Sequence, residues 1–107
     1  GSFRVYPSAS EPIKFKFADK NVSVKDISAG GLSFKNDGFE VGTQEDVKIK
    51  LPGEETEMEI TLEVVKIIEA KNMCCCEFLD LTGDDEDAIY GYAIKRQKEE
   101  LQAKKKR

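Results

Sequence analysis

Short runs in which apolar and polar residues alternate make up most of the chain. In residues 13–17 every second residue is apolar and lysines stand between them, so one face of an extended segment can be buried while the other stays in water. Comparable runs lie at residues 22–27, 32–34, 46–51, 58–68 and 73–79, with turn-forming residues between them. Five or six antiparallel strands at this spacing predict a small β-barrel or a β-sandwich.

The alternation breaks at two places within these runs. The step from Val24 to Ile27 departs from strict alternation, and the long run at 58–68 slips in phase at Val64-Val65. An extra residue in one strand of an antiparallel pair bends that strand and increases its twist. The slip at Val64-Val65 therefore predicts a bulge or bend that helps the sheet to close.

A helical period replaces the alternation near the end of the chain and predicts a helix at about 84–103. Thr82 is a suitable N-cap, and the acidic residues 84–87 favour a helix N-terminus. An apolar stripe recurs at helical spacing and consists of Ile89, Tyr90, Ala93, Ile94, Gln97 and Leu101. We expect the helix to pack on the barrel through Ile89, Ala93 and Ile94 and to fray after Leu101, because an isolated helix of this length is marginal in water.

The chain has 107 residues, enough for one domain, which we expect at residues 3–107 with the barrel at about 11–81. It contains no His, which excludes His-based acid–base catalysis and His-ligated metal sites. No nucleophile–base pair is visible, so we expect no enzyme activity, no cofactor and no metal. Neither a membrane-spanning apolar run nor a signal peptide is present, which predicts a cytoplasmic location. Gly1-Ser2 is typical of residues left by cloning, and we expect the natural chain to continue upstream.

Charge is unevenly distributed along the sequence. The whole chain has 17 basic and 21 acidic residues, but residues 95–107 carry seven basic and two acidic groups. The first 94 residues are therefore strongly acidic, with ten basic and nineteen acidic groups. An acidic body argues against non-specific nucleic-acid binding, which needs a basic face. An anionic ligand would require basic groups that are concentrated locally.

Three cysteines stand side by side at Cys74, Cys75 and Cys76. In an extended strand Cys74 and Cys76 face one side and Cys75 faces the other. Adjacent cysteines rarely form a disulfide with one another, and three in a row make a poor tetrahedral chelate. We interpret them as reduced thiols that fill a strand, with a redox or metal role as the alternative.

The most informative stretch joins two predicted strands through Asp26-x-Ser28-x-x-Gly31. Asp26 and Ser28 lie two residues apart and so point to the same side of a strand. Glycine lets the backbone turn steeply and lets a ligand approach it closely. A carboxylate in such a place can accept hydrogen bonds from a guanine edge. The same residues also fit an ordinary hairpin with an Asx or Ser turn.

This stretch resembles a signature of the PilZ family of receptors for the bacterial second messenger cyclic di-GMP. Residues 3–7 and 12–15 resemble the start of that family, where an Arg-x-x-x-Arg motif leads into the first strand. Residues 76–81 and 90–101 resemble its last strand and closing helix. The resemblance implies a six-stranded antiparallel β-barrel with a C-terminal α-helix and a non-enzymatic, nucleotide-binding function in second messenger signalling.

The resemblance also implies roles for individual residues. Asp26, Ser28 and Gly31 match the family's base-reading residues, and Arg4 matches the second arginine of the motif, which clamps phosphate and stacks on guanine. The first arginine would then lie upstream of Gly1. If Arg4 were the first arginine instead, Ser8 would stand at the second position and the motif would be broken. Lys14 and Lys16 either add to the local positive field or solvate the outer face of their strand.

Two functions follow from this resemblance. In the first, a mobile N-terminal arginine segment orders over the bound nucleotide and changes the contact with a protein partner or an adjacent domain. In the second, the chain is a degenerate PilZ-like adaptor that binds protein and no nucleotide.

Overall fold

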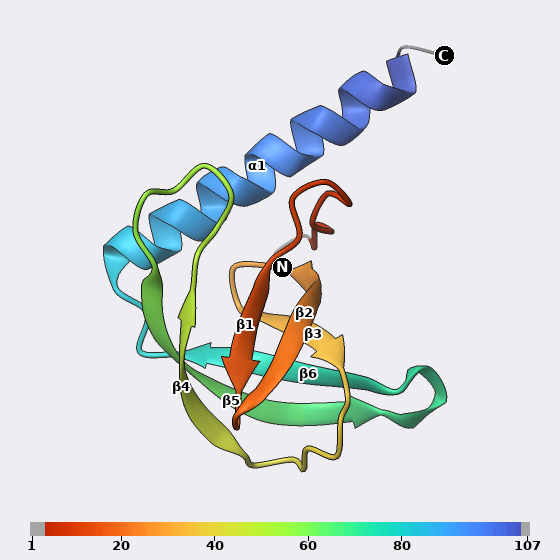
Figure 1. Cartoon of the computed structure of the whole chain (residues 1–107). Coiled ribbons are helices and arrows are strands. Elements are labelled where there is room, and N and C mark those ends of the chain that lie inside the picture. Colours follow the sequence, from red (N-terminus) through yellow and green to blue (C-terminus); the bar gives the residue numbers. More distant parts are fainter. Residues whose placement is uncertain (1–3, 106–107) are drawn as a thin grey trace.

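The computed structural model describes residues 4–105 and contains six strands and one long helix (Figure 1). Gly1, Ser2 and Phe3 and the end of the basic tail lie outside the described residues. The strands are β1 Lys14–Phe17, β2 Lys20–Ile27, β3 Gly31–Lys35, β4 Gln44–Ile49, β5 Met58–Ile68 and β6 Met73–Leu79. A short 3-10 helix, Glu69–Lys71, joins β5 to β6, and α1 Gly83–Lys105 ends the chain.

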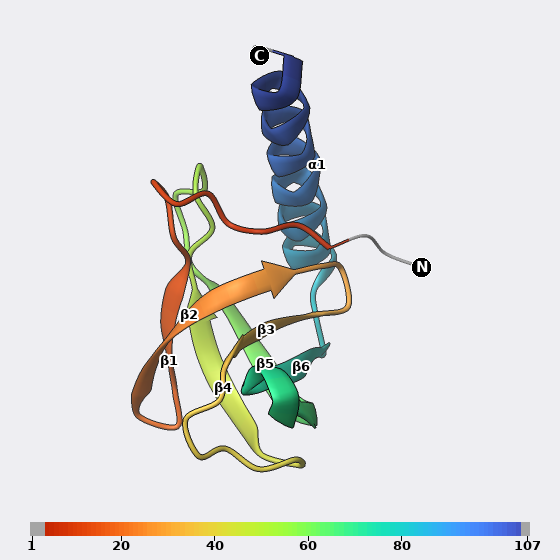
Figure 2. The ribbon, with the colours of Figure 1, turned by 90° about the vertical axis from the view of Figure 1, so that its right-hand side faces the viewer.

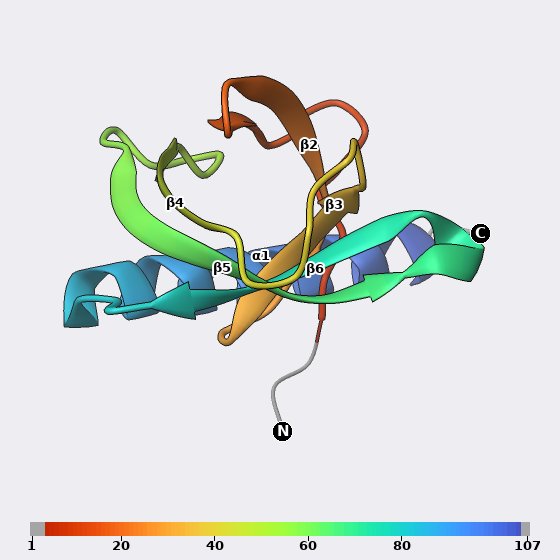
Figure 3. The same ribbon diagram turned by 90° about the horizontal axis from the view of Figure 1, so that it is seen from below.

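The six strands form one antiparallel sheet in the order β1-β2-β3-β6-β5-β4. The sheet curls so that its edge strands β1 and β4 meet without forming a ladder of hydrogen bonds (Figure 3). This nearly closed barrel with a C-terminal helix is the predicted fold, and the sandwich alternative is wrong. The strand predicted at 46–51 begins two residues earlier and ends at Ile49.

Two β-bulges lie where the alternation of the sequence breaks. The register of β2 against β3 shifts between Val24 and Asp26, and that of β5 against β6 shifts between Val64 and Lys66. The second bulge confirms the bend predicted at Val64-Val65. Bulges increase local twist and bend a strand, which suits a sheet that must curl into a barrel.

Four phenylalanine rings from β1, β3 and the loop after β3 pack together in the barrel interior. Phe15, Phe17, Phe34 and Phe39 are buried, with ring centroids 5.0 to 5.8 Å apart. Most of these pairs meet edge to face, the arrangement that the ring quadrupole favours. Because these residues alternate with exposed ones along β1, burial of one face fixes the register of the first hairpin.

Helix α1 begins at a capped N-terminus. The backbone N–H of Asp85 donates to Oγ1 of Thr82 over 3.1 Å, which satisfies one of the free donors of the first turn. The helix packs its first half against the barrel and then projects past it (Figure 1). No helix within residues 4–105 is both long enough and apolar enough to cross a membrane.

The face by which α1 packs differs in part from the predicted stripe. Ile89 and Ala93 are buried as predicted, but Tyr92 and Arg96 complete the buried face. Ile94 is only partly buried, and Tyr90 and Leu101 are 61% and 55% exposed. The predicted and observed stripes are neighbouring faces of one helix, and the direction in which the helix crosses the barrel decides between them. The helix also continues past Leu101 to Lys105.

Candidate functional site

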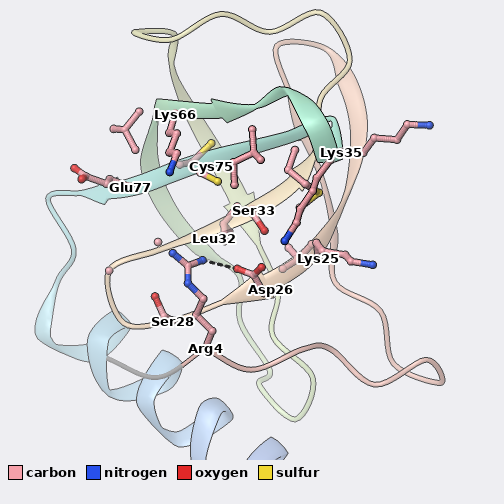
Figure 4. A pocket seen from close by; sticks show the side chains of 18 of the residues that line it. Arg4, Lys25, Asp26, Ser28, Leu32, Ser33, Lys35, Lys66, Cys75 and Glu77 are labelled. Carbon is pink, nitrogen blue, oxygen red and sulfur yellow. Dashed lines mark hydrogen bonds and ion pairs between the residues drawn. The ribbon is translucent and has the colours of Figure 1, made fainter. Parts of the chain in front are cut away.

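A broad groove of about 1340 Å³ lies on the outer face of the sheet (Figure 4). Strands β2, β3, β5 and β6 and the N-terminal segment line it. All four residues predicted for the site contribute to its wall: Arg4, Asp26, Ser28 and Gly31. The structure therefore brings together residues from two separate parts of the sequence.

A row of cross-strand neighbours runs through the groove. Asp26 of β2 pairs with Ser33 of β3, Ser33 pairs with Cys75 of β6, and Cys75 pairs with Lys66 of β5. All four residues belong to the groove. The hydroxyl of Ser33 is fully buried and has no hydrogen-bond partner within the described residues. Because the two bulges set this register, they also decide which side chains share the groove.

Arg4 is held against the strand that carries Asp26. Its Nη1 donates to Oδ1 of Asp26 over 2.7 Å. Val5 forms an isolated bridge with Ile27, in which each backbone N–H donates to the other residue's carbonyl over 3.0 Å. The Asp26 side chain is 16% exposed and the Arg4 side chain 57% exposed. Arg4 is thus presented at the open side of the groove, while Asp26 lies at its wall.

Ser28 and Gly31 close the turn between β2 and β3. The backbone N–H of Ser28 donates to the carbonyl of Gly31 over 2.8 Å, and that of Phe78 donates to the carbonyl of Gly30 over 3.0 Å. Neither glycine has a positive φ, so left-handed backbone is not the reason for glycine here. A Cβ on Gly31 would lie 2.0 Å from the Cys76 carbonyl oxygen, whereas one on Gly30 would meet no atom within 4 Å. Gly31 is therefore required for the close approach of β3 to β6.

Basic groups gather in the groove although the chain as a whole is acidic. Five basic residues line the groove: Arg4, Lys25, Lys35, Lys66 and Lys71. Only two acidic residues line it, Asp26 and Glu77. This is the local concentration that an anionic ligand requires. Lys14 and Lys16 are exposed on β1 and do not line the groove, so they solvate the outer face of their strand.

A sequence profile described as "PilZ domain" matches residues 2–95. The chain belongs to the PilZ domain family. This membership confirms the resemblance found in the sequence. No curated, characterised protein sequence matches the chain significantly.

Several solved structures share this fold. The PilZ domain of YcgR from Escherichia coli, solved with c-di-GMP, superposes with a TM-score of 0.71 at 14% identity and covers 99% of this chain and 97% of that one. The MrkH-c-di-GMP complex of K. pneumonia gives 0.69 at 20% identity, covering 99% and 54%. The inhibitor of motility MotI/DgrA of Bacillus subtilis gives 0.69 at 22% identity, covering 90% and 49%. This PilZ domain therefore spans about half the length of the last two proteins.

The three cysteines of this PilZ domain divide between the core and the groove. Cys74 and Cys76 are buried, and Cys75 faces the groove. Burial raises the pKa of the Cys74 and Cys76 thiols, that of Cys76 strongly. Both thiols therefore stay protonated and unreactive near neutral pH. All three cysteines are free, and no cluster of metal-binding side chains occurs within residues 4–105.

Several residues of the groove were not predicted from the sequence. Ser33, Lys66 and Cys75 reach it through strand register, and Lys35 and Lys71 reach it from the far ends of their elements. Lys25 directly precedes Asp26, so its position next to the motif was the one available signal.

Proposed function

We propose that this PilZ domain is a receptor for cyclic di-GMP and that the nucleotide occupies the groove. The observation that carries the proposal is the meeting of Arg4, Asp26, Ser28 and Gly31 around one basic groove on an acidic chain. Family membership and the c-di-GMP complexes of YcgR and MrkH support the choice of ligand. The proposed role is recognition and signalling, and it involves no catalysis.

The contacts of Asp26 and Arg4 suit a guanine nucleotide. Arg4 engages only Oδ1 of Asp26, which leaves Oδ2 to accept hydrogen bonds from the N1–H and N2–H of a guanine. The half-exposed Arg4 guanidinium can stack on a base and pair bidentately with phosphate. The backbone at Gly31, which has no side chain, lets the base approach the β2–β3 turn.

Signalling in this proposal begins at the N-terminal segment. Val5 is already tied to Ile27 by two backbone hydrogen bonds, so the change on binding is expected at the Arg4 side chain. Nucleotide contacts would draw this side chain away from Asp26 and fix it on the ligand, which alters the surface offered to a partner or an adjacent domain.

The adaptor function remains the second candidate because two features of the site are explained without a nucleotide. Arg4 and Asp26 neutralise one another directly, and Gly31 is needed for strand packing. An adaptor would use the same surface to bind protein.

Calorimetric titration decides between the two functions. Cyclic di-GMP is titrated into this chain and into a version extended to carry an arginine four residues before Arg4. We expect saturable binding that is tighter in the extended chain, because two guanidinium groups then contact the ligand. Cyclic di-AMP is the control, since adenine lacks the N1–H and N2–H groups from which Asp26 would accept hydrogen bonds. Absence of binding to both chains would contradict the receptor function and favour the adaptor.

A further inference from the structure

Arg96 of α1 is a buried charged residue that is only 8% exposed. Burial of a guanidinium is costly unless its donors are paired. Nη1 donates to Glu99 over 2.8 Å and Nη2 to Glu100 over 2.6 Å, both on the same helix. These contacts raise the pKa of Arg96, the Glu99 hydrogen bond most of all. The two carboxylates thus fix the guanidinium in one orientation.

A third donor of Arg96 forms a hydrogen bond outside the helix. Its Nε donates to the backbone carbonyl of Tyr6 over 2.7 Å. The N-terminal segment passes beside α1 on its way to β1 (Figure 2). Because the acceptor is a backbone atom, the contact depends on the path of the segment and not on the side chain at position 6.

Three consecutive residues are therefore held by three different partners. Arg4 pairs with Asp26, Val5 bridges Ile27, and Tyr6 accepts from Arg96. The first two contacts attach the segment to β2 and the third attaches it to α1. The position of Arg4 in the groove therefore depends on contacts with both β2 and α1.

We propose that Arg96 is a positioning residue that holds the N-terminal segment so that Arg4 faces Asp26, and that it thereby couples the groove to α1. The ligand part of this proposal rests on the proposed function, but the positioning part does not. Coupling between two sites is reciprocal, so a nucleotide that engages Arg4 must also affect how α1 is held. The second half of α1 projects from the barrel, where a change in the position of the helix would alter the exposed surface (Figure 1).

The variants for the test are Arg96→Met, which keeps the aliphatic stem and removes the donors, and Arg96→Lys, which keeps the positive charge but places its donors on a single nitrogen. Lys98→Met is the matched control because it removes one charge from an exposed position of the same helix. Arg96→Lys also serves if Arg96→Met does not fold.

Hydrogen exchange in the ligand-free chain tests the positioning role. We expect the amides of Val5 and Ile27 to exchange about tenfold faster in Arg96→Met than in the wild type, as loss of a hydrogen bond to a charged group would produce. Lys98→Met should leave them unchanged and Arg96→Lys should restore part of the protection. Amides of the β5–β6 pair should not change, which separates a local effect from general destabilisation. Unchanged exchange at Val5 and Ile27, or equal acceleration in β5–β6, would overturn the proposal.

Titration of cyclic di-GMP then tests the coupling. We expect Arg96→Met to bind about tenfold more weakly than the wild type, and Lys98→Met to bind normally. Bound nucleotide should slow exchange of α1 amides near Arg96 in the wild type and not in Arg96→Met. Equal affinities with equal protection would overturn the coupling. If neither the wild type nor the chain extended to carry the upstream arginine binds the nucleotide, the proposed function and the coupling are both contradicted, while the exchange measurement still decides the positioning role.

Discussion

Asp26 combines two demands at one side chain, because it anchors Arg4 and forms part of the wall of the groove. Replacing it by alanine should weaken cyclic di-GMP binding by about 10- to 100-fold, which corresponds to the ~1.5–3 kcal/mol of a hydrogen bond to a charged group. The fold should persist, because the lost contact involves a largely exposed arginine. Calorimetry measures the affinity and circular dichroism the fold. Asp37→Ala, at an exposed carboxylate of another turn, is the control, and an unaltered affinity for Asp26→Ala would remove Asp26 from the site.

Gly31 and Gly30 are neighbours with opposite surroundings, so they form a matched pair. Gly31→Ala should lower the melting temperature, since its Cβ would lie 2.0 Å from the backbone oxygen of Cys76 and β3 or β6 would have to shift. The Cβ in Gly30→Ala would meet no atom within 4 Å, so this variant should leave the melting temperature nearly unchanged. Thermal unfolding of the two variants checks this, and similar melting temperatures would show that β3 can move away from β6 at little cost.

At the scale of residues, the sequence could place two side chains together only where they are close along the chain. Asp26 and Ser28 could be placed together because they are only two positions apart, one in β2 and one directly after its end. Lys66 and Cys75 could not, because their place beside Asp26 depends on the register of three strand pairs and on both bulges. For Gly31, the sequence suggested a steep turn and close ligand approach as the reasons for glycine, whereas its steric contact with β6 is visible only once the strands are paired.

At the scale of elements, α1 shows what periodicity can and cannot supply. A period of 3.6 residues located the helix to within two residues of its ends, and Thr82 was correctly predicted as its cap. The period does not choose between neighbouring apolar stripes. Tyr92 and Arg96 look polar in the sequence, yet they complete the buried face because the barrel and the N-terminal segment lie against it.

The packing of α1 gives a prediction at this scale. Ile89 is 1% exposed, so Ile89→Ala should lower the free energy of unfolding by about 2–5 kcal/mol. Leu101→Ala removes a side chain that is mostly in solvent and should change it by less than about 0.5 kcal/mol. Urea denaturation measures both. A comparable loss in Leu101→Ala would mean that the projecting half of α1 also packs on something, such as a second copy of the chain.

At the scale of the whole molecule, the barrel could be predicted because alternation, turn residues and phase breaks all agreed with it. The sequence could not show the order of the strands, which places β3 beside β6 and so builds the groove from residues that pair 38 to 46 positions apart in the chain. That order depends on pairings between distant segments, which the pattern within each segment does not specify.

The buried thiols make the stability of the whole fold sensitive to alkaline pH. Burial raises the pKa of Cys74 and Cys76 above the ordinary value of 9.0. Below that pH both states hold the protons, and stability is unaffected. Above about pH 9 the unfolded chain releases them while the native state retains them, so the free energy of unfolding should fall as pH rises. Urea denaturation between pH 8 and 10 measures the slope. In Cys76→Ala the slope should be shallower, and an equal slope would assign the effect to other groups.

Two lysine variants can distinguish the effect of the groove's local positive charge on ligand affinity from the effect of the net charge of the chain. Lys66 lines the groove, whereas Lys14 is exposed on β1 outside it, and replacement of either by glutamine changes the net charge equally. At about 0.1 M salt the Debye length is roughly 10 Å, so only nearby charges act strongly on a bound anion. Lys66→Gln should therefore weaken cyclic di-GMP binding several-fold and reduce its dependence on salt, while Lys14→Gln should bind like the wild type. Calorimetry at two salt concentrations measures both. Equal losses in the two variants would show that net charge governs the affinity, and the basic lining of the groove would then have no specific role in holding the ligand.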